Sequence, residues 1–210
     1  MYELSALPDT VLTSKLKSME DLTDAVTLKD LSGAPRKFTV DDYMELPDDD
    51  GKRYQILDGE LDETPAPIPR HQRVSRKLQY QLMTALEETG LGEVFDAPTD
   101  LILDRHNVVE PDLLFIRQEN LKIIGEKNIQ GIPDLVIEIL SPTTRRTDVI
   151  KKSRIYASFK VPYYWIVDPE IDRLDVYSLE GAVYRLAQSA SAPEVFKPSA
   201  FPTVELSLAK

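Results

Sequence analysis

Two carboxylates stand inside strand-like runs where apolar side chains are expected. Glu138 lies in the middle of "GIPDLVIEILSPTT", which otherwise reads as a buried strand, and Asp112 follows Pro111 at the head of "LLFI". An ionised carboxylate among apolar side chains is costly unless a cation, a metal or a shifted pKa compensates it. Strand alternation places Glu138 with Val136 on one face, so this carboxylate is committed to one side of the sheet.

A lysine occupies a similar position on the helix predicted over residues 145–159. With about 100° per residue, Lys152 lies near the centre of the apolar sector of this helix. That sector is formed by Val149, Ile155, Tyr156 and Phe159. A lysine there either extends its ammonium group to solvent or points at negative charge, and the strand carrying Glu138 comes just before it in the chain.

Two carboxylates and a lysine that meet at a strand end predict a site for Mg²⁺, with Mn²⁺ as a substitute. Mg²⁺ takes carboxylate and water oxygens and bridges to phosphate, so Asp112 and Glu138 are the expected ligands. The metal would polarise a phosphodiester and lower the pKa of bound water. Lys152 would orient that water or stabilise the charge of the transition state.

Each of the three residues also has a simpler interpretation when taken alone. Glu138 can be the partner of a buried Lys or Arg, or lie on an exposed edge strand. Asp112 can be a strand-start residue, and Lys152 can pair with Asp148 on a solvated helix face. The coincidence of all three in this order favours the metal site.

The elements around these residues predict an α/β or α+β fold with a mixed central β-sheet flanked by helices. Residues 133–140, the helix over 145–159 and "PYYWIVD" form a strand, helix, strand unit whose strands are expected to be parallel. "GEVFDAPTDLILD" and "NVVEPDLLFIR" predict an antiparallel hairpin around residues 104–107. "PRHQRVSRKLQYQLMTALEETGLG" predicts a long helix that ends at Gly90.

Shorter elements are expected at both ends of this core. A short helix capped at Thr39 and an additional N-terminal hairpin around Asp58-Gly59 precede it. A closing hairpin around Glu180-Gly181 and a short strand in "FPTVELSL" follow it. We expect residues 1–37 to form an appendage, weakly structured or helical, and residues 38–210 to form one domain.

The amino-acid composition excludes several kinds of protein and of metal site. The chain has 210 residues, no cysteine and two histidines, which excludes disulfides and thiolate zinc sites and favours a hard cation on oxygen ligands. No apolar run approaches the ~20 residues that cross a bilayer, and the N-terminus lacks the pattern of a signal peptide, so a cytoplasmic protein is expected. The net charge of −11 argues against nonspecific coating of nucleic acid but leaves room for a local basic groove.

Two basic clusters are candidates for binding substrate phosphates. One opens the long helix and the other surrounds the helix that carries Lys152. A solvated basic face is an equally open interpretation of each cluster. The residues we expect to bind substrate are His71, Arg73, Arg145 and Arg146.

The sequence from about residue 38 to 208 resembles the Uma-type putative restriction endonuclease family of the PD-(D/E)XK nuclease superfamily. The motifs that carry the resemblance include "KRYQILDGEL", "PAPIPRHQRVSRKL", "NVVEPDLLFI" and "GIPDLVIEILSPTTRRTDVIKKSRIYASFKVPYYWIVDP". The catalytic Asp of the family falls on Asp112 and its Glu on Glu138. Two residues later the superfamily lysine is replaced by Leu140, and the lysine of this family maps to Lys152 on the following helix.

The resemblance also concerns two further positions. Glu60 in "LDGEL" matches an additional acidic member of such sites, and family members commonly carry glutamate where this chain has Gln55. The resemblance implies a restriction-endonuclease-like fold, a divalent metal and hydrolysis of DNA phosphodiester bonds. Because the superfamily includes members without catalysis, a catalytically silent binding or regulatory protein is the alternative. Hydrolysis of a smaller phosphoester is a third interpretation, and a homodimer is one assembly that the resemblance allows.

Overall fold

The structure is a computed structural model that describes residues 36–46, 52–64 and 66–208. Its larger sheet has six strands in the order β11-β10-β9-β8-β6-β3. β8 and β9 are parallel and the other neighbours are antiparallel, so the sheet is mixed. Its strands are β3 (Gly92–Asp96), β6 (Leu113–Arg117), β8 (Leu135–Ile139), β9 (Tyr163–Asp168), β10 (Arg173–Glu180) and β11 (Val183–Ser191).

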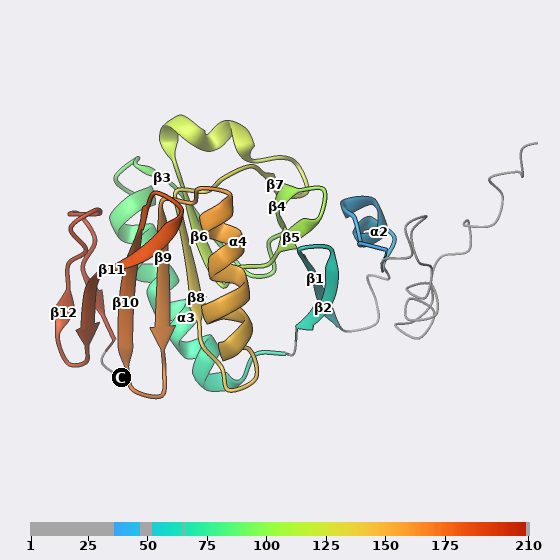
Figure 1. Cartoon of the computed structure of the whole chain (residues 1–210). Coiled ribbons are helices and arrows are strands. Elements are labelled where there is room, and N and C mark those ends of the chain that lie inside the picture. The colour runs from blue at the N-terminus through green and yellow to red at the C-terminus, as the bar shows by residue number, and fades with distance from the viewer. Residues whose placement is uncertain (1–35, 47–51, 65, 209–210) are drawn as a thin grey trace, which may run out of the picture.

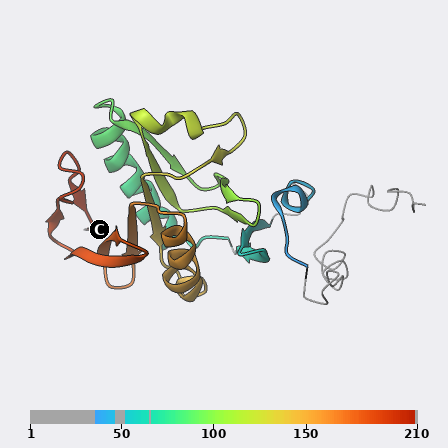
Figure 2. The ribbon, with the colours of Figure 1, turned by 45° about the horizontal axis from the view of Figure 1, so that its top comes forward.

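One face of this sheet is covered by α3 (Pro69–Leu82), which continues into a π-helical turn, η1 (Met83–Glu87). Figure 1 shows α3 behind the sheet, and the view in Figure 2 confirms that it runs along that face. Its apolar side repeats every three to four residues and packs against the sheet. The buried cluster on this face includes Leu78, Leu82, Leu86, Phe115, Leu135, Ile137 and Trp165.

The opposite face is covered by α4 (Ser153–Ser158), which follows a second π-helical turn, η3 (Thr147–Lys152). The buried cluster here includes Ile155, Tyr156, Leu114, Val136, Tyr164 and Ile166. Glu138 lies on the same side of β8 as Val136, as the sequence predicts. The predicted strand, helix, strand unit is confirmed, because β8 and β9 are parallel on either side of α4 in the chain.

The N-terminal hairpin belongs to a second, five-stranded sheet in the order β2-β1-β5-β4-β7. The predicted turn at Asp58-Gly59 and the helix cap at Thr39 are both confirmed. α2 (Val40–Met44) lies beside this sheet. Its strands are β1 (Arg53–Leu57), β2 (Glu60–Thr64), β4 (Leu101–Asp104), β5 (Asn107–Val109) and β7 (Ile129–Gln130).

The predicted antiparallel hairpin over residues 92–117 is divided between the two sheets. β4 pairs with β5 in the smaller sheet, whereas β3 pairs with β6 in the larger one. Pro98 and Pro111 lie at the two breaks, because proline cannot donate a ladder hydrogen bond. Asp112 therefore lies where the chain passes from one sheet to the other.

The remaining elements close the fold. The predicted hairpin around Glu180-Gly181 is confirmed as β10 and β11, and β12 (Val195–Phe196) pairs with the predicted last strand, β13 (Leu206–Ser207). η2 (Gln118–Ile123) is a 3₁₀ helix that follows β6. The fold class is confirmed as mixed α+β, with two mixed sheets flanked by few helices.

Two expectations concern regions at the margin of the structure. Residues 1–35 of the predicted appendage lie outside the described residues, and the domain boundary at residue 38 stays a prediction. Across the described ranges, the structure contains no helix with the length and apolar character of a membrane span.

Candidate active site

Asp112 and Glu138 are brought together by the pairing of β6 with β8. Leu113 pairs with Ile137, and continuing this antiparallel register by one residue places Asp112 opposite Glu138. The backbone N–H of Ile139 donates to Asp112 Oδ2 over 2.7 Å. A backbone donor thus fixes one oxygen of Asp112 beside the strand that carries Glu138.

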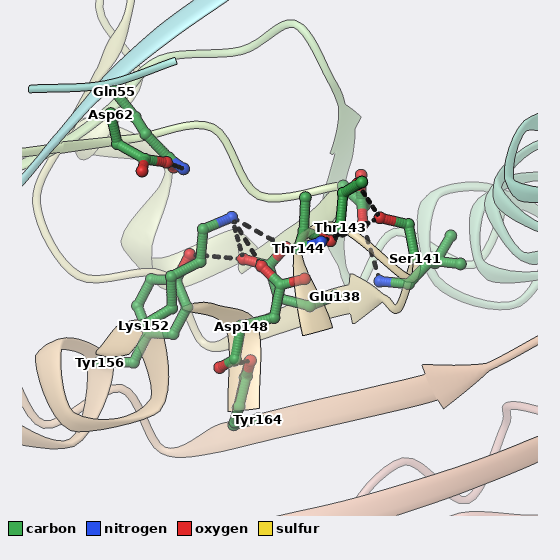
Figure 3. Close-up of polar contacts among 12 residues, drawn as sticks. Gln55, Asp62, Glu138, Ser141, Thr143, Thr144, Asp148, Lys152, Tyr156 and Tyr164 are labelled. Atoms are coloured by element: carbon green, nitrogen blue, oxygen red, sulfur yellow. Dashed lines mark hydrogen bonds and ion pairs between the residues drawn. The ribbon is translucent and has the colours of Figure 1, made fainter. Parts of the chain in front are cut away.

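Lys152 supplies the positive charge of the site. Its Nζ lies 3.0 Å from Glu138 Oε1, 3.1 Å from Glu138 Oε2 and 3.4 Å from Asp148 Oδ1. The Tyr156 hydroxyl donates to Glu138 Oε1 over 2.8 Å (Figure 3). The side chains of Lys152, Glu138 and Asp148 are only 5%, 2% and 4% exposed, so these interactions are almost dry.

The π-helical turn η3 changes which side chains face the sheet. The 100° period predicts Val149 on the buried side, but Val149 is 41% exposed, and this expectation is wrong. Asp148 is buried instead, and Lys152 keeps its predicted place. A π turn spaces its hydrogen bonds at i→i+5 and rotates side chains relative to a regular helix, and such turns are frequent at functional sites.

Burial and mutual repulsion shape the ionisation of these groups. Burial is the main cause that raises the pKa of Glu138 from its ordinary value of 4.5 to about 8. The negative charges of Asp148 and Asp112 raise this pKa further, whereas the positive charge of Lys152 lowers it. Burial also raises the pKa of the Asp148 carboxyl. Burial alone would lower the pKa of Lys152, but Glu138, Asp148 and Asp112 outweigh it and raise that pKa. The site therefore keeps Lys152 charged and has more carboxylates than cations.

His71 approaches the same cluster from the start of α3. Its Nε2 lies 3.1 Å from Asp112 Oδ2, and its side chain is 11% exposed. The other ring nitrogen, Nδ1, is buried and has no hydrogen-bond partner among the described residues. His71 thus joins the site through its contact with Asp112.

A cavity of about 200 Å³ lies at this junction. Besides the residues above, its lining includes Arg53, Glu110 and the segment over residues 141–144. Arg53 Nε and Glu110 Oε2 are 3.3 Å apart but are buried without a hydrogen bond within the described chain. Burial raises the pKa of the Glu110 carboxyl, against the effect of Arg53. Buried polar atoms usually have a hydrogen-bond partner, so water, an ion or a ligand in the cavity could supply the partners that these atoms lack.

The donor set at this cavity fits a hard divalent cation. Four carboxylates line it, those of Glu110, Asp112, Glu138 and Asp148, against the two permanent cations Arg53 and Lys152. In the described part of the chain, no three His, Asp or Glu side chains are spaced to hold an ion alone. Mg²⁺ is usually held by one or two carboxylates and completes its octahedron with water and phosphate oxygens, so a pair of carboxylates such as Asp112 and Glu138 is compatible with this cation.

Comparison with known proteins identifies the family. The model of the family described as "Uma2: Putative restriction endonuclease" matches residues 40–209, which is most of the chain. The chain belongs to the Uma2 family. The match includes every residue of the cavity lining and both sheets.

A solved structure supports the fold of this Uma2 protein. The crystal structure of a putative nuclease belonging to DUF820 from Anabaena variabilis ATCC 29413 matches with a TM-score of 0.67. The two chains are 18% identical, and the match covers 81% of this chain and 95% of the other. No curated protein matches the chain. The family is described as one of putative restriction endonucleases, which suggests nuclease function at a coarse level, and the neighbour shows a similar fold.

The N-terminal hairpin of the Uma2 domain presents Gln55 and Glu60 on the same face. Gln55 pairs with Asp62 and Leu57 with Glu60, so alternation puts all three polar side chains on one side. Glu60 is exposed and binds Lys151, 2.6 Å away, which lowers the pKa of the Glu60 carboxyl. It does not line the cavity.

Gln55, in contrast, is buried. Its amide nitrogen donates to Asp62 over 2.8 Å, and its Oε1 has no partner among the described residues. Figure 3 shows the ends of Gln55 and Asp62 directed towards the Lys152 ammonium group. Gln55 is therefore the hairpin residue whose buried side chain is directed towards the site. It stands at the position where the family resemblance predicts glutamate.

The other predicted substrate-binding residues lie outside the cavity lining. Arg145 pairs with Asp168 over 2.6 Å, and Arg146 is exposed next to it. Arg73 lines a separate groove along α3. The structure thus brings His71 to the carboxylate cluster and leaves the three arginines outside the lining of its cavity.

Sequence reasoning missed several members of the site. Glu110 precedes Asp112 by two residues in "EPD", which is a signal that could have identified it. Tyr156 lies one turn after Lys152 but reads as part of the apolar face, because a tyrosine hydroxyl gives no sign in a hydrophobic pattern. Arg53 comes from the other sheet, and no spacing along the chain connects it with the site.

Proposed function

We propose that this Uma2-family protein is a Mg²⁺-dependent DNA endonuclease that hydrolyses phosphodiester bonds with a metal-activated water. The observation that carries the proposal is a buried lysine, Lys152, held against Glu138 directly opposite Asp112 at the wall of a cavity. An ion pair used only for stability does not need to line a cavity or to lie next to a second carboxylate. Buried ion pairs are in any case weak contributors to stability.

Asp112 and Glu138 would hold the metal. When bound, Mg²⁺ or a substituting Mn²⁺ would polarise the scissile phosphate and lower the pKa of its bound water. The N–H of Ile139 and the His71 ring both contact Asp112 Oδ2, and no described residue donates a hydrogen bond to Oδ1. This arrangement orients Asp112 and leaves one oxygen available as a ligand.

Lys152 would stabilise negative charge that develops on the phosphate. Its ammonium group carries three donors, and Glu138 and Asp148 hold it in place at the wall of the cavity. Tyr156 shares Glu138 Oε1 with Lys152 and so limits the rotation of the carboxylate. The nearly complete burial of this group excludes bulk water, which strengthens each electrostatic interaction.

The test is nicking of supercoiled plasmid by the full chain with Mg²⁺, compared with Glu138→Gln. This variant keeps the shape of the side chain but removes the ligand charge. Glu63→Gln is the matched control, because Glu63 is an exposed glutamate on β2 that pairs with Lys52. We expect nicking by wild type and the control and at least about a hundredfold less by Glu138→Gln, since preorganised charges of this kind are worth about 10²–10³ in rate. Equal nicking by all three proteins, or none by wild type, would refute the proposal.

One observation supports a second candidate, a catalytically silent nuclease-fold binding protein. Gln55 is buried and directed towards Lys152, and its Oε1 has no partner among the described residues. A glutamate at this position would add a negative charge to the site. Gln55→Glu decides between the two candidates. Nicking that appears only in Gln55→Glu would assign the wild-type chain to the silent class.

A further inference from the structure

The outer face of α3 carries a basic groove that is separate from the cavity. The groove has a volume of about 880 Å³. Leu78 and Leu82 of the same helix do not line it, because they are buried against the sheet. Its lining is Arg70, Arg73, Val74, Arg76, Lys77, Tyr80, Asp172 and Leu208.

The charge of α3 contrasts with that of the whole chain. The chain has 36 acidic and 25 basic residues, yet the 14 residues of α3 contain no Asp or Glu. A solvated helix face normally mixes both signs, because pairs three or four residues apart then attract each other. Here Arg73 lies three residues from both Arg70 and Arg76, and such like-charge pairs are destabilising.

The position of these charges on α3 is also unfavourable for the helix itself. The N-terminus of a helix carries partial positive charge and prefers acidic residues in its first turn. α3 begins instead with Pro69, Arg70 and His71 and has no acidic residue there. Helix stability therefore does not explain this cluster, whereas binding of an anion does.

The contacts leave part of the cluster available. Arg70 donates to the carbonyl oxygen of Pro169 and lies 3.5 Å from Asp172, so it is already held. No described carboxylate pairs with Arg73 or Arg76. Tyr80 shares the groove with them and is 71% exposed, which is unusual for a large aromatic side chain.

We infer that this groove binds the DNA strand as it leaves the catalytic cavity, with Arg73 and Arg76 on consecutive phosphates and Tyr80 stacked on an unpaired base. The inference rests on the proposed function in that the strand belongs to the DNA being cleaved. α3 links the two places, because His71 lines the cavity and the groove begins at the adjacent Arg70. At 1.5 Å per residue, His71 and Tyr80 are separated along the helix by about 14 Å, or about four nucleotides at 3.4 Å per step.

The chemistry of the groove favours nucleic acid over other anions. Guanidinium groups bind phosphate oxygens in a bidentate manner, and base stacking on an exposed aromatic side chain tolerates any sequence. An acidic peptide would offer carboxylates but no flat ring for Tyr80. The basic stripe and the aromatic side chain together therefore point to a strand with both phosphates and bases.

The experiment measures binding of fluorescein-labelled single-stranded and duplex DNA to the full chain by anisotropy. EDTA is present throughout, so no cleavage occurs. The variant is Arg73→Gln/Arg76→Gln, and the matched control is Arg105→Gln/Arg185→Gln, which removes the same charge from two exposed arginines elsewhere. Loss of two phosphate contacts is expected to weaken binding about tenfold or more at 0.1 M salt and to reduce the slope of log K against log salt by about 1.4 to 1.8. The control is expected to stay near wild type.

Tyr80→Ala tests the stacking part of the inference. It is expected to weaken binding of single-stranded DNA by about five- to a hundredfold and binding of duplex much less, because stacking requires an unpaired base. Circular dichroism of each variant verifies that α3 is intact. Equal losses in the groove variant and the control, or binding of polyglutamate as tight as that of DNA, would overturn the inference. Because DNA binding is measured without metal, it does not depend on the nicking assay. Absence of nicking by wild type would refute the proposed function, whereas the binding data would still test the groove.

Discussion

Two Pro-Asp pairs occupy equivalent places at opposite ends of the β6–β8 ladder. Asp112 precedes β6 and accepts the N–H of Ile139 at the end of β8. Asp134 precedes β8 and accepts the N–H of Arg117 at the end of β6, over 2.8 Å. The same local sequence thus produces the same backbone contact twice.

The two aspartates differ in what surrounds their remaining oxygens. The Asn120 amide donates to both oxygens of Asp134, and the residue opposite in the register is the apolar Ile116. Asp112 has an oxygen without a described donor, and the residue opposite is Glu138. A carboxylate whose oxygens both accept hydrogen bonds within the chain, opposite an apolar residue, holds two strands together. An incompletely satisfied one beside a second charge is available to a ligand.

The strongest test of this contrast replaces each aspartate with asparagine. We expect Asp112→Asn to reduce plasmid nicking with Mg²⁺ by at least about a hundredfold, because it removes a proposed metal ligand. Asp134→Asn should retain nicking per folded molecule but lower the free energy of unfolding by about 1–3 kcal/mol, because it weakens hydrogen bonds to a buried carboxylate. Urea denaturation and nicking rates measure both effects. Loss of nicking in folded Asp134→Asn would show that the two sites are not distinct.

The sequence distinguishes these two aspartates only in part. The strand pattern places Asp112, Glu138 and Lys152 together, since alternation in strands and the helical period fix their faces. It places Val149 wrongly, because a π turn in η3 has no signature in apolar spacing. It also misses the division of the predicted hairpin between two sheets, which depends on what each half packs against.

Contacts between distant segments are the other part that local patterns do not contain. Asn120 saturates Asp134 from η2, and Arg53 reaches the cavity from the smaller sheet. Gln55 and Glu60 lie on one face of the hairpin, but only Gln55 is buried, because the tertiary packing of the hairpin decides exposure. Periodicity predicts on which face of a strand or helix a residue lies. The segments that pack on that face determine which atoms its side chain contacts.

A second comparison concerns the cation at each end of the ladder. Lys152→Met leaves Glu138 and Asp148 buried without their cation, and we expect it to destabilise the protein by about 3–5 kcal/mol. Arg117→Met removes a cation that is 37% exposed and 3.6 Å from Asp134, so its effect should stay at or below about 1 kcal/mol. Denaturant unfolding of both variants measures the difference.

The double variant Lys152→Met/Glu138→Gln provides the control for this prediction. It removes one of the two unpaired carboxylates together with the lysine, so it should recover part of the stability that Lys152→Met loses. If the double variant were as unstable as Lys152→Met, the cost would come from packing rather than from charge.

Ionisation of Glu138 should make the stability of the protein depend on pH. Because the pKa of Glu138 is raised from 4.5 to about 8, the folded state binds more protons than the unfolded state in this window. The contribution of Glu138 is therefore complete below about pH 4.5 and is lost as pH rises towards 8, with a slope of at most about 1.4 kcal/mol per pH unit. We therefore expect the unfolding free energy of wild type to fall relative to that of Glu138→Gln as pH rises, because only wild type carries the titrating group.

Addition of Mg²⁺ should oppose this loss, because a divalent cation binds the ionised carboxylate and favours proton release. We therefore expect Mg²⁺ to raise the melting temperature of wild type more at pH 8 than at pH 6, and Glu138→Gln to respond less at both. Asp134→Asn should keep the wild-type response to Mg²⁺, because its carboxylate already has its donors within the chain. An equal response to Mg²⁺ in wild type and Glu138→Gln would place the cation elsewhere and remove the chemical difference between the two ends of the ladder.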